Sequence, residues 1–271
     1  MSLDMASGIH IEIRGSGPAL VMIHGWAMHG GIFAPLSERL ARHCTLHIVD
    51  LPGHGHSRAH AGDFSLDACA TELLSQLPRA AWLGWSLGAL IALRAAAMRP
   101  EHVSALIALA GSPRFVRSPD WPQAVEAQVF QTFADELGGH YARTLDRFLA
   151  LEAHGSEHMR DELRALRAQI FTRGEPDPRV LIEGLAMLAE SDLRAQLPTL
   201  PMAALWVAGR RDRLVPWQAM HAAAESMVSG RFLRVEGAGH APFLSDADEV
   251  AAAVVDFLST TLPNPSASAW G

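Results

Sequence analysis

The segment Gly84 to Gly88 (GWSLG) constrains the fold of this chain more than any other. The apolar run Ala80–Gly84 enters it and the Ala- and Leu-rich run Leu87–Met98 leaves it, which predicts a buried strand, a sharp turn and a helix. Such a turn strains the backbone of Ser86 and leaves no room for side chains at Gly84 and Gly88. The pattern predicts a serine hydroxyl above a sheet, at a helix N-terminus that favours negative charge. A glycine-rich turn with an incidental serine is the alternative.

Short apolar runs alternate with helical patterns along most of the chain, which indicates an α/β fold with a mostly parallel sheet. The predicted strands are Ile9–Ile13, Ala19–Ile23, Thr45–Val49, Ala80–Gly84, Val103–Ala110, Ala203–Ala208 and Arg231–Val235. The helices predicted after the fifth strand are Gln123–Leu137, Tyr141–Leu151, Ser156–Phe171, Pro178–Ala189 and, at the end, Asp246–Leu258. We therefore expect a core formed by residues 1–112 and 192–262, a helical lid at 113–191 and a flexible tail at 263–271.

The composition excludes several classes of function. A formal net charge of −7 disfavours a general nucleic-acid binder. All 22 basic residues are arginine, so mechanisms that need a lysine, such as Schiff bases and Ser–Lys dyads, are excluded. Cys44 and Cys69 fit neither a disulfide framework nor a zinc-ligand pattern. Since we find no secretory signal and no apolar run of about 20 residues, we expect a cytoplasmic protein that has no membrane partner. We also expect a monomer.

A serine nucleophile needs a base and an acid that orients the base. Among 14 histidines, His240 stands out because its loop (GAGHAPF) follows the predicted strand Arg231–Val235. Asp212 lies in GRRDRLVP, directly after the strand Ala203–Ala208. Since the carboxyl ends of parallel strands build the site of such a sheet, we expect Ser86, Asp212 and His240 to converge as nucleophile, acid and base. A surface histidine and an ion pair of the aspartate with neighbouring arginines are the alternatives.

A tetrahedral intermediate also needs two hydrogen-bond donors for its oxyanion. The backbone N–H of Leu87, directly after the serine, is the first candidate. The second is the backbone N–H of Trp26, in the HGW motif that follows the strand Ala19–Ile23. Gly25 in that motif allows the main chain to pass close to the site.

Three further histidines invite functional interpretations. His24 precedes the glycine of HGW and is either a second base or a structural loop residue. His54 and His56 form an HxH pair, which is a possible metal ligand set. Because no acidic or histidine partner at ligand spacing is evident, we expect no metal and no organic cofactor.

Five motifs, HGW, DLPGHGHS, GWSLG, GRRDRLVP and GAGHAPF, resemble those of the α/β-hydrolase superfamily over nearly the whole chain. Longer segments resemble the pimeloyl-[acyl-carrier protein] methyl ester esterases of biotin synthesis; these are HGWAMHGGIF, CTLHIVDLPGHGHSR, AAWLGWSLGALIA, the pair Ser112-Pro113 and RFLALEAHGSE. The last segment weighs most because it falls in the lid, and lids diverge quickly. The resemblance implies hydrolysis of the methyl ester of a pimeloyl chain on an acyl carrier protein, with release of methanol.

The resemblance also implies roles for lid residues. The arginines that it implies contact the carrier protein are Arg143, Arg147, Arg160 and Arg164. The apolar stripe that it implies lines the acyl chain is Phe148, Leu149, Ala150, Leu151 and Glu152. Arginines four apart lie on one helix face, and a basic patch on an acidic protein would attract an acidic carrier. Ordinary solvated helix charge and packing of the lid on the core are the alternatives.

Other activities use the same fold. Haloalkane dehalogenases and epoxide hydrolases carry aspartate at the position of Ser86, which argues against both. A general short-chain carboxylesterase, a C–C bond hydrolase and a cofactor-free perhydrolase keep the same triad and remain open. A non-catalytic binding protein is disfavoured by the intact triad.

Overall fold

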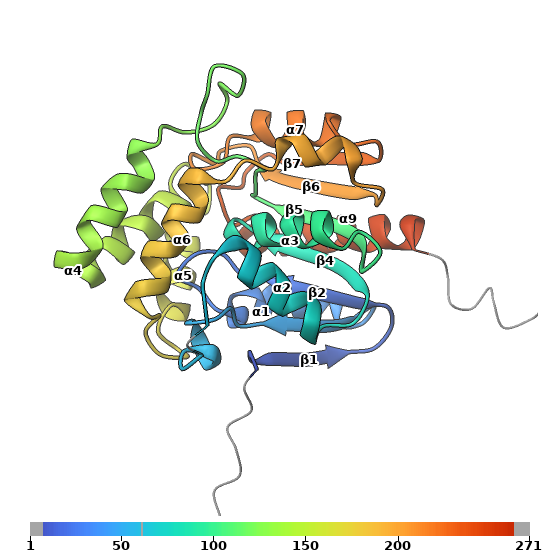
Figure 1. Cartoon of the computed structure of the whole chain (residues 1–271), viewed down its shortest axis with the longest axis horizontal. Helices are drawn as coiled ribbons and strands as arrows, with labels where there is room; N and C mark the ends of the chain where they lie inside the picture. The colour runs from blue at the N-terminus through green and yellow to red at the C-terminus, as the bar shows by residue number, and fades with distance from the viewer. Residues whose placement is uncertain (1–7, 61, 263–271) are drawn as a thin grey trace, which may run out of the picture.

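A seven-stranded sheet forms the centre of the computed structural model, which describes residues 8–60 and 62–262 (Figure 1). The strands are β1 (Ile11–Gly15), β2 (Ala19–Ile23), β3 (Thr45–Val49), β4 (Ala80–Trp85), β5 (Val103–Leu109), β6 (Ala204–Gly209) and β7 (Gly230–Val235). Their order is β1-β3-β2-β4-β5-β6-β7, with β1 antiparallel to β3 and every other pair parallel. The predicted α/β class and its seven strands are confirmed, with bounds shifted by one or two residues.

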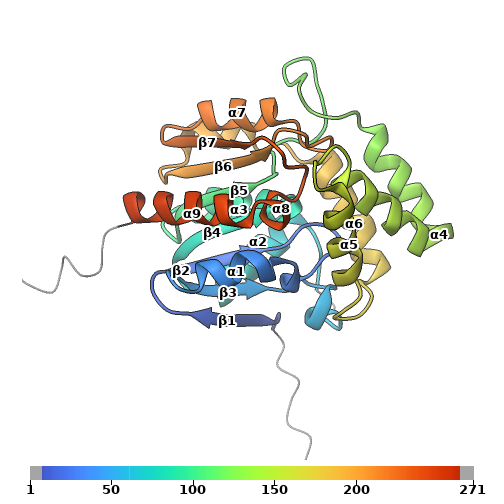
Figure 2. The same cartoon turned by 180° about the vertical axis from the view of Figure 1, so that it is seen from behind.

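Helices cover both faces of the sheet, so the central strand β4 is buried along its whole length. The helices are α1 (Ala34–Leu40), α2 (Leu66–Gln76), α3 (Leu87–Met98), α4 (Gln128–Ala153), α5 (Met159–Gln169), α6 (Pro178–Glu190), α7 (Trp217–Glu225), α8 (Pro242–Ser245) and α9 (Ala247–Thr261). Helices α2 and α3 lie on the face seen in Figure 1, and α1 and α9 lie on the face seen in Figure 2. Four of these helices, α1, α2, α7 and the short α8, were not predicted from the sequence.

Residues 113–191, called the helical insertion below, separate β5 from β6 and stack α4, α5 and α6 against one end of the sheet (Figures 1 and 2). As predicted, the described part of this segment holds no strand, only two isolated bridges. The helices predicted at Gln123–Leu137 and Tyr141–Leu151 correspond to the two halves of α4, which meet at a kink where the backbone of His140 is not helical (φ −142°, ψ 48°). Glycine is a weak helix former, so the Gly138-Gly139 pair directly before His140 explains why the helical pattern of the sequence is interrupted at this point.

Two further predictions concern the C-terminal tail and the crossing of a membrane. The flexible tail predicted at 263–271 lies outside the described residues. Among the helices that the structure describes, none combines the length and the apolar character that crossing a membrane requires.

Candidate active site

Ser86 occupies a strained turn between β4 and α3, as the glycine spacing predicts. Its φ of 54° and ψ of −116° lie in a region that non-glycine residues rarely adopt. A Cβ atom added at Gly84 would lie 2.2 Å from the carbonyl oxygen of Gly88, and one added at Gly88 would lie 2.2 Å from that of Ile23. The close approach of the three main-chain segments therefore requires glycine at both positions.

His240 is fully buried and is held by its neighbours on three sides. Its Nδ1 lies 2.8 Å from Oδ2 of Asp212, whose Oδ1 accepts hydrogen bonds from the backbone N–H groups of Leu214 and Val215. The indole of Trp85, next to Ser86 in the chain, donates to the His240 carbonyl oxygen at 2.8 Å. Burial disfavours the imidazolium, but the Asp212 carboxylate outweighs burial and raises the pKa of His240 above its ordinary value.

The structure thus joins Asp212 to His240 and places the histidine loop against Trp85. Oγ of Ser86 and Nε2 of His240 are both buried, and neither has a hydrogen-bond partner within the described residues. Buried polar atoms usually have partners, and those that lack them in a native protein are candidates for a catalytic role. The serine and histidine are therefore not hydrogen-bonded to each other in this structure, and neither reactive atom is engaged by another group among the described residues.

Two backbone N–H groups flank the serine. A Cβ atom added at Gly25 would lie 3.3 Å from Cβ of Ser86, so the HGW segment passes directly beside the nucleophile. Within residues 8–60 and 62–262, the backbone N–H groups of Trp26 and Leu87 donate to no protein acceptor. A Cβ atom at Gly184 of α6 would lie 2.8 Å from the Trp26 ring and 3.4 Å from the Leu87 side chain, so the helical insertion covers both residues.

One face of α4 covers the site. Phe148 stacks on Trp26 with ring centroids 4.4 Å apart, and the carbonyl oxygen of Glu152, one turn later, accepts the His240 backbone N–H at 3.2 Å. Phe148, Leu149 and Glu152 are buried, whereas Ala150 lies on the exposed face of the helix. Of the five residues in the predicted stripe, three therefore lie on the buried face of α4. Leu151 is half-buried, and Ala150 is exposed.

The comparisons with known proteins agree with this architecture. A sequence profile described as "alpha/beta hydrolase fold" matches residues 18–247. The chain belongs to the α/β-hydrolase family. It is 52% identical over 252 residues to the pimeloyl-[acyl-carrier protein] methyl ester esterase of Xanthomonas oryzae pv. oryzae, covering 93% of this chain and 99% of that one. It is also 52% identical over 255 residues to the enzyme of the same name from Stenotrophomonas maltophilia, covering 94% and 98%.

Solved structures give the same fold at much lower identity. An esterase from Exiguobacterium antarcticum superposes with a TM-score of 0.82 at 23% identity, covering 93% of this chain and 95% of that one. The enol-lactonase of Burkholderia xenovorans superposes with a TM-score of 0.80 at 21% identity, covering 93% and 96%. At these identities the structures show the fold alone, and the profile match over residues 18–247 confirms the family that the five motifs indicated.

The four arginines singled out in this α/β hydrolase all lie on the surface of the helical insertion, and they differ in their pairing. Arg147 is paired with Glu136, and Arg164 with Asp161 of its own helix. Arg143 and Arg160 form no ion pair with any described residue, so their charges are available to a partner. Arg167, a third arginine of α5, forms an ion pair with Asp146.

His24 is a structural residue in this hydrolase. Its Nδ1 donates to the Gly25 carbonyl oxygen at 2.7 Å, and its Nε2 accepts the backbone N–H of Leu51 at 3.0 Å. Burial and the neighbouring His54 lower the pKa of His24 to about 3, so its ring stays neutral. With both ring nitrogens engaged, His24 does not serve as a second base.

The HxH pair separates in the structure. His54 is buried and bonds the Pro52 carbonyl oxygen, whereas His56 lies with His10 and Asp50 in a group whose ligand-type atoms are all within 4.8 Å. The sequence did not reveal these two neighbours of His56. The Asp50 carboxylate is already saturated, because its oxygens accept hydrogen bonds from backbone N–H groups and from an arginine, which favours a structural role over metal binding.

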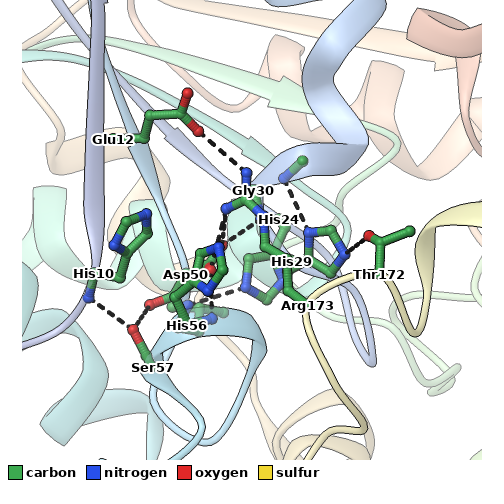
Figure 3. A network of polar contacts seen from close by, with 12 residues as sticks. His10, Glu12, His24, His29, Gly30, Asp50, His56, Ser57, Thr172 and Arg173 are labelled. Atoms are coloured by element: carbon green, nitrogen blue, oxygen red, sulfur yellow. Dashed lines mark hydrogen bonds and ion pairs between the residues drawn. The ribbon is translucent and has the colours of Figure 1, made fainter.

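Figure 3 shows that arginine, Arg173, reaching from the helical insertion into the core. Its guanidinium lies 3.1 Å from Oδ1 of Asp50 and 3.1 Å from Oε2 of Glu12. The ring of His29 in the same network meets the Gln169 carbonyl oxygen at 2.8 Å and the Thr172 hydroxyl at 2.9 Å. These contacts fasten the end of α5 and the turn after it to β1 and the loop after β3.

Proposed function

We propose that this α/β hydrolase is a serine carboxylesterase that hydrolyses the methyl ester of pimeloyl-acyl carrier protein in biotin synthesis. The observation that carries the proposal is the buried Ser86 on a strained turn, directly after Trp85, whose indole donates to the carbonyl oxygen of the His240 that pairs with Asp212. The 52% identity to esterases of that name, over nearly the whole chain, supports the substrate. We further propose that the protein acts as a cytoplasmic monomer without a metal or organic cofactor.

The proposed reaction has two halves that share one base. His240 accepts the Ser86 proton as Oγ attacks the ester carbonyl carbon, and the N–H groups of Trp26 and Leu87 stabilise the oxyanion. The C–O bond to the methoxy group then breaks, and His240 returns the proton so that methanol leaves. Water, deprotonated by the same imidazole, attacks the acyl-serine carbonyl carbon. The bond from this carbon to Ser86 Oγ then breaks, and the imidazolium returns the proton to Oγ as the acid is released. Asp212 stabilises the imidazolium that forms in each half.

The helical insertion is the proposed lid and carrier surface. Because Ser86 and His240 are fully buried, an ester reaches them only when α4 or α6 moves. Phe148 and Leu149 on the buried face of α4 are the proposed contacts of the acyl chain. The exposed Arg143, Arg147, Arg160 and Arg164 are the proposed contacts of the acidic carrier, led by Arg143 and Arg160, which have no ion-pair partner among the described residues.

The test compares two substrates on two proteins. Wild type and Ser86→Ala are assayed with pimeloyl-acyl carrier protein methyl ester and with p-nitrophenyl butyrate. The proposal expects a higher kcat/KM for the carrier-linked ester in wild type, and loss of both activities in Ser86→Ala by about 10⁴-fold or more. A preference for the free short ester would favour a general carboxylesterase, and full activity of Ser86→Ala would overturn the mechanism.

A further inference from the structure

The indole of Trp26 is anchored on α6 of the helical insertion. Its Nε1–H donates to the Leu181 carbonyl oxygen at 2.8 Å, and the ring is fully buried. A Cβ atom added at Gly184, three residues later on α6, would lie 2.8 Å from Cδ1 of this ring and 3.3 Å from Nε1. Because real Cβ atoms essentially never come within 3.0 Å of another heavy atom, an alanine at position 184 would displace the ring. A hydrogen bond and a close fit therefore fix the indole on α6.

The backbone around Trp26 forms a tight and strained turn. The backbone N–H of Met28 donates to the Gly25 carbonyl oxygen at 3.3 Å, and Ala27 between them has a φ of 61°. Glycine usually takes a positive φ at this position of a turn, because other residues crowd their own backbone there. Among the described residues, only two other non-glycine residues have a positive φ, and one of them is Ser86. Such conformations persist where the surrounding structure holds them in place, so the turn that carries the Trp26 N–H depends on contacts outside itself.

Helix α6 is fastened to the core at its start. The backbone N–H of Asp177, directly before α6, donates to the Gly53 carbonyl oxygen at 2.9 Å. Val180 packs so closely on this loop that a Cβ atom added at Gly53 would lie 2.5 Å from its Cγ1. Since Leu181 and Gly184 follow directly on the same helix, the anchor of the indole is fixed relative to the loop after β3.

We propose that Gly184 and the Leu181 carbonyl group position the oxyanion donor of this hydrolase through the Trp26 indole, an inference that rests on the proposed function. The donor is the backbone N–H of Trp26, so a displaced ring shifts it through the shared Cα atom. A preorganised donor is effective only when it points at the oxygen on which negative charge develops. Gly184 and Leu181 are positioning residues, because they act on the indole. The helical insertion thus contributes to catalysis as well as covering the site.

The experiment compares Gly184→Ala with Gly139→Ala in the hydrolysis of p-nitrophenyl butyrate. Gly139→Ala is the matched control, because it adds the same methyl group to a helix of the insertion at a position where a Cβ atom meets nothing within 4 Å. We expect Gly184→Ala to lower kcat by about tenfold, a part of the roughly 100-fold or greater loss that follows removal of a whole donor. Both half-reactions pass through an oxyanion and slow alike, so KM should stay within about twofold of wild type. Gly139→Ala should match wild type in both constants.

An alkyl trifluoromethyl ketone, used as an inhibitor, reports on the oxyanion directly. Oγ of Ser86 adds to its carbonyl carbon, His240 takes the serine proton, and the carbonyl oxygen becomes an oxyanion like that of the tetrahedral intermediate. We expect its inhibition constant to rise about tenfold in Gly184→Ala and to stay at the wild-type value in Gly139→Ala. If Gly184 only shaped the acyl pocket, KM would rise and kcat would not change.

Four outcomes would overturn the inference. They are a wild-type kcat in Gly184→Ala, a raised KM with unchanged kcat, an unchanged inhibition constant, and an equal loss of kcat in Gly139→Ala. If Gly184→Ala does not fold, as judged by circular dichroism, Trp26→Phe takes its place. It keeps the backbone N–H and removes the indole donor to Leu181, so the same changes in kcat and inhibition constant are expected. Activity in Ser86→Ala would refute the proposed function itself, which separates that failure from failure of the role of Gly184.

Discussion

Asp50 and Glu152 are both buried carboxyl groups where the helical insertion meets the core, and their surroundings are opposite. Asp50 accepts hydrogen bonds from the backbone N–H groups of Gly30 and His56 and lies beside the Arg173 guanidinium. Glu152 has no donor within the described residues. Burial alone would raise the pKa of either group, yet the donors around Asp50 lower its pKa, whereas that of Glu152 rises to about 8.

The difference separates two uses of a buried carboxyl group. The satisfied network at Asp50 fixes the end of α5 and the turn after it to the sheet, far along the chain from the nucleophile. The unsatisfied group at Glu152 lies against the histidine loop, where it weakens the fold. Local violations of packing rules are expected at functional sites, because selection there acts on chemistry more than on stability.

The largest expected effect comes from removing the cation at Asp50. Arg173→Met leaves a buried carboxylate without its counter-charge, and we expect the free energy of unfolding at pH 7 to fall by about 3 kcal/mol. Because the pKa of Asp50 is lowered in the folded state, this loss should shrink as the pH falls through that pKa and the group takes up a proton. Urea unfolding at pH 7 and pH 3 measures both values.

Arg179→Met is the matched control for that experiment. Its salt bridge to Glu183 is exposed, so we expect a change of less than about 0.5 kcal/mol. Equal losses in the two variants would show that the network at Asp50 contributes no more than a surface pair.

A smaller effect of opposite sign is expected at Glu152. Its folded-state pKa is raised, so its contribution to stability is best at low pH and is lost as the pH rises from about 4.5 through about 8. Glu152→Gln should therefore match wild type near pH 4.5 and become steadily more stable than wild type as the pH rises towards 8. Thermal or urea unfolding across this range provides the measurement, and a difference that does not change with pH would contradict the assignment.

The smallest change in stability is expected outside both networks, at the exposed arginines. The double variant Arg143→Ala, Arg160→Ala should change the free energy of unfolding by less than about 0.5 kcal/mol. On the proposed function it should raise KM for the carrier-linked ester by about tenfold and leave KM for p-nitrophenyl butyrate unchanged. Substitution of Arg167, which is paired with Asp146, is the control. Equal KM values for the carrier-linked ester in the double variant and in wild type would refute the carrier surface.

Much of the fold and part of the site followed from the sequence because their signals are local. The glycine at position 84 reflects a main-chain contact within five residues, with Gly88, although Gly88 itself also meets the distant Ile23. The order of the motifs places Asp212 and His240 after neighbouring strands. The central strands β2, β4, β5 and β6 are short and almost entirely apolar, so their pattern is clear. Helices α1, α7 and α8 were missed because they are short, at 7, 9 and 4 residues, whereas α2 was missed although it is as long as α5.

The missing hydrogen-bond donor of Glu152 and the neighbours of His56 could not be predicted from the sequence. Resemblance placed Glu152 in the stripe that starts at Phe148, but the absence of a donor depends on how α4 packs on the loop after β7. The neighbours of His56 include His10, which the pairing of β1 with β3 brings close from 46 positions away. Sequence spacing carries no information about such contacts, which the tertiary structure alone creates.

Labelling with a fluorophosphonate, followed by mass spectrometry of the digested protein, tests the central claim most directly, because it reports which residue is the activated nucleophile. The account predicts one phosphonyl adduct on the peptide that contains Ser86, formed at least 100-fold more slowly in His240→Ala, by about 3 kcal/mol of lost activation. An adduct on another residue, or labelling of Ser86 at the same rate in His240→Ala, would contradict it.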